Sequence, residues 1–401
     1  MMHHPYPLKA KFWTPGVLVL LACMVAGALA LVARFTGGIG YVSNLSTARP
    51  WGLWIGVDVA SGVALAAGGF TTAFLAYIAG RHSFESVVRP ALLTAMLGYT
   101  FVVLGLLVDI GRSWAIWKPM VFWNFNSVLF EVAMCVMFYL NVLYIEFIPI
   151  VVEQFKGRVN LPGPLAGLNG LAESVLGLAE RILGKVMWLF IIAGVVLSCM
   201  HQSSLGSLML VAPTKLHPLW YTPILPLLFL TSAAAVGYPM VVFETTLITT
   251  SMNLDGEMGT LTPLTRLTIY LLGFYMALKI GDMVVRGTYV HLLEGTTRTN
   301  SFLVEMFLGV IIPWLMLLSE KVRRSRRALF TACAMVVGGV ALNRINVFVV
   351  GYQPPVSDAG YFPAVGEILV TVGLISTLMF IYRLLVTHLP VLSAPAREAS
   401  S

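Results

Sequence analysis

Charged side chains interrupt many of the long apolar stretches of this sequence. At the centre of a membrane helix a charged group costs ~2.5–3.5 kcal/mol on insertion scales, so each needs a physical reason to be there. One reason is packing through a buried ion pair, and Asp282 and Arg286 have the four-residue spacing of such a pair. The number of charged and polar residues at membrane depth also indicates a polar cavity in which chemistry takes place. The set comprises Asp58, Asp109, Arg112, Glu131, His201, Lys279, Asp282, Glu305, Arg344 and Glu367.

His201 opens an unusually polar segment, because Gln202, Ser203 and Ser204 follow it directly. An imidazole can donate a hydrogen bond and also pass a proton near neutral pH. The two carbonyls of a quinone need groups that do both, so a histidine at membrane depth near acids and arginines is a candidate for a quinone site. The alternative is a histidine that only caps the end of its helix.

The other histidines do not supply a second ligand at the same depth. A membrane cytochrome b of the bis-histidine type holds each haem iron between two intramembrane histidines. His217 and His291 are expected in loops, and the remaining ones are His3, His4, His82 and His388, on the cytoplasmic side or near the end of the chain. The sequence therefore predicts that no haem is bound.

The four cysteines, Cys23, Cys135, Cys199 and Cys333, stand singly within apolar runs. Without a C-x-x-C pair they do not offer the usual ligands of an iron–sulfur cluster or a structural zinc site. We therefore assign no metal ligand in this chain and expect any iron–sulfur cluster to belong to partner subunits.

The composition excludes a soluble protein. Hydrophobic residues make up 58% and charged residues 11% of the 401 residues, against about 45–50% and about 25% in soluble domains. This predicts an all-α membrane protein of about ten transmembrane helices, residues 1–401 forming a single polytopic domain. Runs of spanning length fall at about 13–34, 51–79, 90–110, 123–150, 186–200, 219–250, 264–286, 301–319, 328–350 and 363–388.

The net charge of +7 indicates topology rather than nucleic-acid binding, because the lysines and arginines lie mostly in short loops. They are concentrated on the side of the amino terminus, so the positive-inside rule places both termini in the cytoplasm and the chain in a bacterial inner membrane. The polar set then lies mainly in the periplasmic half. Ala28-Leu29-Ala30 resembles a signal-peptidase site, but the length of the run 13–34 favours an uncleaved anchor.

Two segments four helices apart have similar sequences, Asn126-Ser127-Val128-Leu129-Phe130-Glu131 and Asn300-Ser301-Phe302-Leu303-Val304-Glu305. They predict two parallel four-helix bundles, helices 2–5 within 51–210 and helices 6–9 within 211–350, with the first and last helices peripheral. Chance similarity is the alternative. Residues 151–185 are expected to form a cytoplasmic interfacial loop.

Several segments resemble those of a known family, the NrfD/polysulfide-reductase-type membrane subunits, and within it the HybB-like subunits of membrane-bound nickel–iron hydrogenases. The resemblance runs from Pro50-Trp51-Gly52 to Tyr361-Phe362-Pro363. Its most specific part is the His-Gln-Ser-Ser-x-Gly-Ser-Leu-Met segment that begins at His201. The other segments are Val88-Arg89-Pro90-Ala91-Leu92-Leu93, Asp109-Ile110-Gly111-Arg112, Asn126 to Glu131, and His217-Pro218-Leu219-Trp220.

The resemblance implies a membrane subunit beneath a periplasmic ferredoxin-type iron–sulfur subunit, with a quinone site near that surface and no haem. In HybB-like chains the further partners are the hydrogenase small and large subunits. The candidates for quinone binding are His201, Glu131, Asp109, Arg112, Gln202 and Asp58, and those for proton transfer are Glu131, Tyr99, Glu244 and Arg89.

We interpret the chain as the subunit that passes electrons from hydrogen oxidation to menaquinone or ubiquinone. Proton translocation coupled to this electron transfer is left open. A rival within the family is a quinol-oxidising membrane anchor of another reductase complex. A rival of another class is a secondary transporter, which could also have ten helices and internal repeats. Helices broken by Gly or Pro at matched midplane positions, which would favour a transporter, are not obvious here.

Overall fold

The computed structural model describes residues 7, 11–252, 254, 258–354 and 360–392. The chain is 80% helical, and its described part contains no strand; Leu216 and Tyr352 form an isolated antiparallel bridge. Ten segments among the described residues are helices long and apolar enough to cross a membrane. The prediction of an all-α membrane protein with about ten spans is confirmed. The division into two four-helix bundles stays a prediction.

The ten spans follow one another along the chain, and the second, eighth and ninth include π-helical stretches. In chain order they are α1 (Pro15–Gly37); η1 (Trp54–Ser61) with α3 (Gly62–Leu65), α4 (Gly68–Ala73) and η2 (Phe74–Ile78); α5 (Glu85–Asp109); α6 (Val128–Phe155); α7 (Asn169–Ser207); α8 (Leu225–Ser251); α9 (Met258–Val285); α10 (Thr297–Met306) with η10 (Phe307–Ile311) and α11 (Ile312–Leu318); α13 (Arg326–Ile345) with η11 (Asn346–Val350); and α14 (Val365–His388).

These segments are helical because a helix satisfies its own backbone polar groups, which lipid cannot do. Local signals set their ends. Pro15 occupies the first turn of α1, where the missing amide costs no hydrogen bond. Ser127 caps α6, its hydroxyl accepting a hydrogen bond from the Phe130 amide at 3.3 Å. Gly38, with a φ of 88°, ends α1.

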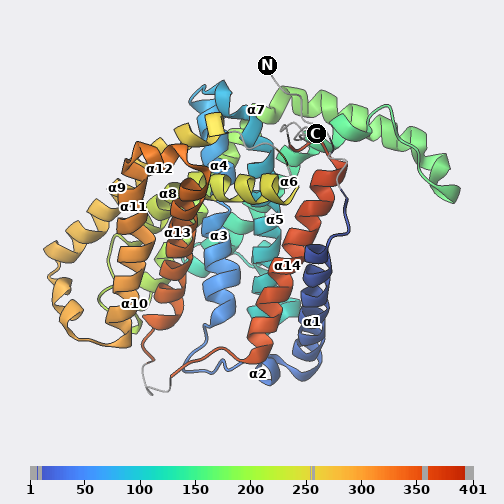
Figure 1. Cartoon of the computed structure of the whole chain (residues 1–401). Coiled ribbons are helices and arrows are strands. Elements are labelled where there is room, and N and C mark those ends of the chain that lie inside the picture. The colour runs from blue at the N-terminus through green and yellow to red at the C-terminus, as the bar shows by residue number, and fades with distance from the viewer. Residues whose placement is uncertain (1–6, 8–10, 253, 255–257, 355–359, 393–401) are drawn as a thin grey trace.

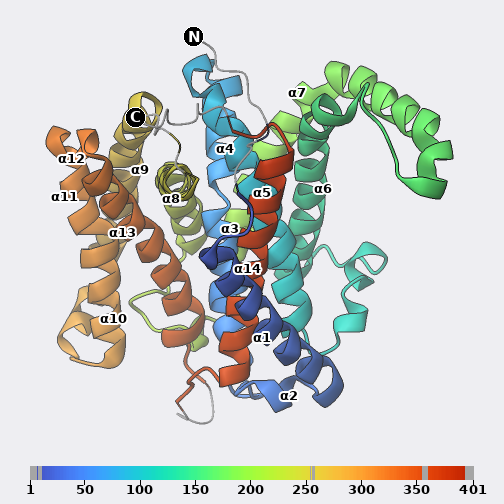
Figure 2. The same cartoon turned by 45° about the vertical axis from the view of Figure 1, so that its right-hand side comes forward.

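Figures 1 and 2 show the spans standing side by side, with α1 against α14 at one flank. We call the face at which α1 begins and α14 ends the upper face, after its place in Figure 1; it also carries α12 (Glu320–Arg324). The opposite, lower face carries α2 (Ile39–Val42) and the connections 211–224 and 286–296. The second span is the most deeply buried of the ten.

Two helices depart from a straight crossing. α8 contains Pro239, which removes one helical hydrogen bond, and its yellow-green part runs across the bundle in Figure 1 and appears end-on in Figure 2. α7 begins at Asn169, inside the segment 151–185 that was predicted as a loop, and its first turns extend from the upper face as an arm. Charged residues in the arm lower its hydropathy and hide the helix. Its exposed apolar side chains have the spacing of an interfacial helix: Leu171, Val175, Leu178 and Ile182.

Glycines allow two pairs of spans to approach closely. A Cβ at Gly339 of α13 would lie 2.2 Å from the Cα of Gly309 in η10, and a Cβ at Gly373 of α14 would lie 2.7 Å from the Cα of Gly27 in α1. Contacts this short are possible only without side chains, as in other membrane helix pairs that pack through small residues. Gly338, the neighbour of Gly339, has nothing within 4 Å of its Cβ position.

The first prediction uses this adjacent pair. Gly339→Ala should destabilise the protein by about 1–3 kcal/mol, because the added methyl group forces η10 and α13 apart. Gly338→Ala should leave the stability unchanged or slightly raise it. The measurement is thermal unfolding of the two purified variants in detergent, followed by tryptophan fluorescence. Equal losses in both variants would show that the crossing is looser than described.

Candidate functional site

The side chains of Tyr99, Tyr139 and His201 meet between α5, α6 and α7. The Tyr99 hydroxyl lies 3.2 Å from His201 Nδ1, and the Tyr99 ring packs edge-on against Tyr139 with centroids 4.5 Å apart. All three are almost completely buried, at 0%, 1% and 2% exposed for Tyr99, Tyr139 and His201. The cluster thus contains groups that can donate hydrogen bonds and exchange protons in a dry interior.

Glu131 of α6 contacts α7 at Ser204, three residues after His201. Its Oε1 lies 2.5 Å from the hydroxyl of Ser204, which also lies 2.8 Å from the Met200 carbonyl. Ser204 is buried and Glu131 is exposed on the outer side of α6. Glu131 therefore contacts α7 one turn after His201, which lies on the buried side of the same helix. Whether both line one cavity stays a prediction.

Gln202, the neighbour of His201, points toward the second span. Its Nε2 donates a hydrogen bond to the Val63 carbonyl at 2.7 Å, and its buried Oε1 has no hydrogen-bond partner among the described residues. A buried acceptor of this kind is costly unless a ligand or water supplies a donor. The polar stretch of α7 therefore presents His201 to α5 and Gln202 to the second span.

Asp58 and Asp109 belong to a different group of side chains, between α1, the second span, α5 and α14. Asp58 Oδ2 accepts a hydrogen bond from the Thr371 hydroxyl at 2.6 Å. Asp109 Oδ1 is buried without a partner. Arg34 of α1 closes the group by donating to the Val108 carbonyl at 2.9 Å. The structure gives no contact between this group and His201 in the described residues.

Glu367 of α14 anchors the lower end of that group. It accepts hydrogen bonds from the Asn44 amide at 2.9 Å and from the Tyr361 hydroxyl. Burial raises the pKa of Tyr361, and the hydrogen bond to Glu367 raises it further. Arg112, by contrast, is exposed in the connection after α5.

The two remaining proton-transfer candidates lie elsewhere. Glu244 is buried at 8% exposed in α8 and accepts a hydrogen bond from the Tyr382 hydroxyl of α14 at 2.7 Å. Arg89 Nη2 lies 2.7 Å from Glu153 Oε2, and its Nη1 donates to the Pro390 carbonyl at 2.9 Å. The predicted site residues thus form several separate groups. His201 and Gln202 lie on α7, and Tyr99 and Glu131 contact that helix.

A larger polar network lies between α9, α10 and α13, centred on Glu305, which is 1% exposed. Its Oε1 accepts hydrogen bonds from Lys279 Nζ at 2.6 Å and Asn343 Nδ2 at 2.8 Å. Its Oε2 accepts from Trp220 Nε1 at 2.9 Å and Asn346 Nδ2 at 2.8 Å. Each carboxylate oxygen meets two donors, so the network is closely satisfied.

Arg344 extends this network into the interior. It is fully buried, donates to Asn343 Oδ1 at 2.6 Å and Ser232 Oγ at 2.9 Å, and stands 3.7 Å over the Phe229 ring. Lys279 neutralises the charge of Glu305. The Arg344 guanidinium therefore has no carboxylate of its own among the described residues and is held by the Asn343 and Ser232 oxygens and the Phe229 ring.

The sequence indicates this network only in part. It identifies Lys279, Glu305 and Arg344 as charges at membrane depth but does not bring them together in one site. The signal that could have united them is the polar run Asn343-Arg344-Ile345-Asn346 inside an otherwise apolar span, because asparagines in a membrane helix hydrogen-bond to neighbouring helices.

Comparisons with known proteins agree with the predicted resemblance. Residues 42–355 match the family described as "Polysulphide reductase, NrfD". The "Probable Ni/Fe-hydrogenase 2 b-type cytochrome subunit" of Escherichia coli is 33% identical over 398 residues, 98% of this chain and 96% of that relative. A selenate reductase subunit of Mesobacillus selenatarsenatis is 24% identical over 96% of this chain and 95% of that relative. The "Menaquinone reductase, integral membrane subunit" of Nitratidesulfovibrio vulgaris is 30% identical over 50% of this chain and 43% of that relative.

The expectation that no haem is bound is wrong on this comparison, because the Escherichia coli relative is named a b-type cytochrome subunit, which implies haem. The inference from histidine counts was too strong, since haem iron also accepts Met, Cys or Tyr as an axial ligand. Among the described histidines, His201 alone is buried within a spanning segment. The described spans therefore do not hold a buried pair of histidines, and we assign no haem ligand to them.

The second prediction tests the Glu305 network. Glu305→Gln should destabilise the protein by about 3–5 kcal/mol, because it leaves Lys279 buried without its counter-charge. Combining it with Lys279→Met should recover part of the loss, because the unpaired charge is then absent. Glu153→Gln, which breaks the partly exposed pair with Arg89, is the control and should cost about 0–1 kcal/mol.

The measurement is thermal unfolding of the purified variants in detergent. A double variant less stable than Glu305→Gln alone would show that Lys279 is stabilised by other groups. Equal effects of Glu305→Gln and Glu153→Gln would contradict the central role of the Glu305 carboxylate.

Proposed function

This chain belongs to the polysulphide reductase NrfD family, and we propose that it is the quinone-reactive membrane subunit of a respiratory nickel–iron hydrogenase complex. It is an NrfD-type membrane subunit related to a hydrogenase subunit and to membrane subunits of other reductases. The hydrogenase assignment is supported by the extent of the likeness to the Escherichia coli relative, which covers nearly the whole of both chains.

The observation that carries the quinone proposal is the group of Tyr99, His201, Ser204 and Glu131. Reducing a quinone to a quinol adds two electrons and two protons, and the protons must reach the two carbonyl oxygens. A ring that enters between α6 and α7 from the lipid meets the exposed Glu131 first and the buried His201 further in. This route needs no aqueous path, which suits an apolar substrate dissolved in the membrane.

Each side chain has a role in this proposal. His201 donates a hydrogen bond to one quinone oxygen and passes a proton to it, while Tyr99 fixes the imidazole from its other side. Glu131 serves the second oxygen, with Ser204 holding its carboxylate. Gln202, whose Oε1 lacks a donor, takes a hydrogen bond from the quinol once it has formed.

Electrons reach the quinone from a partner. Such a partner is a ferredoxin-type iron–sulfur subunit on the lower face, which the lysine and arginine distribution orients to the periplasm. The hydrogenase small and large subunits lie beyond it. We assign the iron–sulfur clusters to these partners, because the four cysteines of this chain stand singly and are far apart in the sequence.

The likeness to a selenate reductase subunit favours a second candidate, a quinol-oxidising anchor of another reductase complex. The same groups would then accept protons from quinol. Purifying the intact complex and identifying its subunits by mass spectrometry separates the two, because only the hydrogenase contains a nickel–iron large subunit. A transporter is less favoured, since the compared relatives with named functions are subunits of redox complexes.

The third prediction concerns His201. In the purified complex, His201→Gln should lower hydrogen-to-quinone activity by roughly 10²–10⁴-fold, the usual contribution of a general acid or base. Hydrogen oxidation with a soluble dye should stay unchanged, because the dye takes electrons before they reach the membrane subunit. His388→Gln, at the exposed end of α14, is the matched control. Full quinone activity in His201→Gln would exclude His201 from the site.

The fourth prediction concerns the protons. Glu244 and Tyr382 lie toward the upper part of the bundle, and we propose that they continue a route from the cytoplasm to the quinone. Moving one charge against the membrane potential costs ~2.3 kcal/mol per 100 mV, so the redox reaction must supply that energy. Glu244→Gln should reduce the potential built up per quinone reduced while leaving dye-linked hydrogen oxidation intact.

The measurement is hydrogen-to-quinone turnover in proteoliposomes, with the membrane potential reported by a dye. Tyr382→Phe, which removes only the hydroxyl that binds Glu244, should have a smaller effect of the same sign. Glu85→Gln, an exposed acid at the start of α5, is the control. Turnover and potential both unchanged in Glu244→Gln would remove Glu244 from the proton route.

A further inference from the structure

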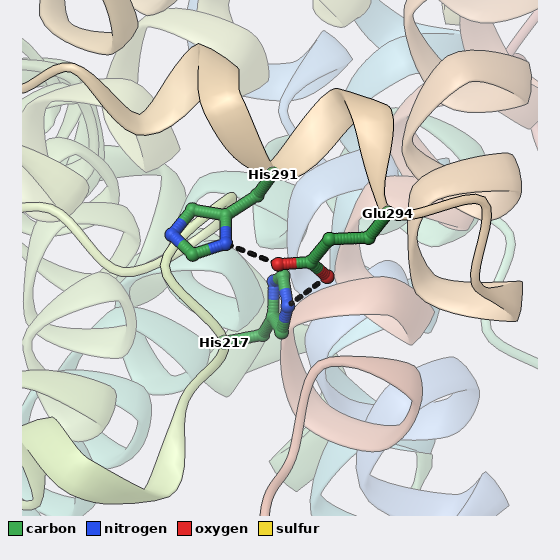
Figure 3. Close-up of side chains that lie close together, drawn as sticks. All are labelled: His217, His291 and Glu294. Atoms are coloured by element: carbon green, nitrogen blue, oxygen red, sulfur yellow. Dashed lines mark hydrogen bonds and ion pairs between the residues drawn. The ribbon is translucent and has the colours of Figure 1, made fainter.

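Three side chains with metal-binding atoms converge at the lower face, outside the spanning helices (Figure 3). They are His217 from the connection after α7, and His291 and Glu294 from the connection after α9, where η9 (Thr288–Leu293) forms a short turn. One ligand atom from each lies within 4.8 Å of the others. The Glu294 carboxylate stands between the two imidazoles, as Figure 3 shows: Oε2 is 3.5 Å from His217 Nε2, and Oε1 accepts a hydrogen bond from His291 Nδ1.

The residue types and spacing match a divalent transition-metal site. Two imidazoles and one carboxylate form a common protein ligand set for Zn²⁺, which binds nitrogen at about 2.0–2.1 Å and oxygen at about 2.0–2.2 Å. Ligand atoms of one tetrahedral ion are then separated by roughly 3.4 Å, close to the 3.5 Å between His217 and Glu294. His291 Nδ1 and Glu294 Oε1 are joined by a hydrogen bond, and they would move apart to this spacing when an ion enters between them.

The surrounding structure holds the ligands in place. His217 is 5% exposed, its amide donates to the Gly351 carbonyl at 2.9 Å, and its carbonyl accepts from the Trp220 amide at 2.9 Å. The His291 carbonyl accepts a hydrogen bond from the Thr299 hydroxyl at 3.0 Å, which ties η9 to α10. His217 is therefore fixed through its backbone to Gly351, just after the ninth span, and His291 is fixed to α10.

His217 can present the nitrogen that a metal needs. The Leu219 amide donates a long hydrogen bond of 3.4 Å to its Nδ1, so the ring proton lies on Nε2, the nitrogen that faces Glu294. When a metal binds Nε2, the ring proton moves to Nδ1 and this long bond breaks. The rings of His217 and His291 are 5.4 Å apart and steeply inclined, so both nitrogens can point to one ion beside Glu294.

The same chain contains a comparison pair that lacks the third ligand. His82 and Glu85 have the same three-residue spacing as His291 and Glu294, and His82 Nδ1 lies 2.7 Å from Glu85 Oε1. Both residues are exposed, and they belong to no group of three ligands in the part of the chain that the structure describes. A histidine and a glutamate at this spacing are therefore an ordinary ion pair, and His217 is what distinguishes the lower-face cluster.

We propose that His217, His291 and Glu294 bind one divalent transition-metal ion, with Zn²⁺ as the expected occupant and a fourth position open to water. The ion takes the place of the N–H protons that face the carboxylate from His217 Nε2 and His291 Nδ1, and each neutral ring then carries its one proton on its other nitrogen. It joins the connection after α7 to the connection after α9, directly beside Trp220, whose indole binds Glu305. Its effect is to clamp the lower face over the Glu305 network. This site is separate from the proposed quinone site and does not depend on it.

The experiment uses the full chain, with its complex where the complex is stable, in a His3→Ala/His4→Ala background that removes two histidines able to bind metal near the amino terminus. The protein is freed of metal with a chelator, dialysed against Zn²⁺ and analysed for bound zinc by mass spectrometry. The expected result is one Zn²⁺ per chain and a rise of the unfolding temperature with Zn²⁺ concentration.

His217→Ala, His291→Ala and Glu294→Gln should each weaken Zn²⁺ binding at least 10-fold and remove the temperature shift, while His82→Ala should change neither. Glu294→Gln keeps a hydrogen-bonding side chain at an exposed position, so its loss of binding cannot come from misfolding. Co²⁺ bound in place of Zn²⁺ should give the absorption of a tetrahedral nitrogen and oxygen site. Binding that is equal in the parent and in His217→Ala/His291→Ala, or that is lost in His82→Ala, would reduce the zinc to an adventitious ion only and overturn the proposal.

Discussion

A carboxylate placed inside a membrane protein must find its partners within the protein, and Glu305 shows how much structure that requirement organises. Its two oxygens receive donors from α9, α13, η11 and the connection before α8. Desolvating one ion costs several kcal/mol even after relaxation, so only near-complete satisfaction makes such a position tolerable. The helices that carry these donors are therefore held in register by one residue.

The group around His201 obeys the same constraint in a different way. The Glu305 network saturates its carboxylate, whereas the Gln202 Oε1 on α7 is left without a donor and Glu131 stays exposed. A site that must bind and release a substrate cannot have all its hydrogen bonds taken by the protein, because the substrate would then gain nothing by entering. The contrast between the fully paired Glu305 carboxylate and the unpaired Gln202 amide oxygen supports the proposal of a quinone site at α7.

The lower face connects the Glu305 network to the loops on which a partner would sit. Trp220 contacts Glu305 through its indole, and its amide hydrogen-bonds the carbonyl of His217 in the same connection. A ligand or partner that changes the connection after α7 therefore acts on a residue that also closes the buried network. This coupling is a direct contact and requires no long path through the bundle.

The sequence alone determined the class of the protein, because membrane insertion depends on local and additive hydropathy. The ten spans and the family follow from it. It placed residues 151–185 at the membrane interface but did not give the start of α7 at Asn169, because the charged residues of the arm lower its hydropathy below that of a span. The haem expectation failed because the absence of paired histidines excludes one type of ligation and not the others.

The partners of each buried group were decided only by the tertiary structure. Glu305 lies 26 residues from Lys279 and 85 from Trp220 along the chain, and Tyr99 lies 102 residues from His201. No local pattern encodes such pairs, because they depend on which faces of the helices meet. His217 and His291 appear in the sequence as unrelated loop histidines for the same reason. Hydropathy predicts the depth of a side chain in the membrane, whereas its contacts depend on how the helices pack.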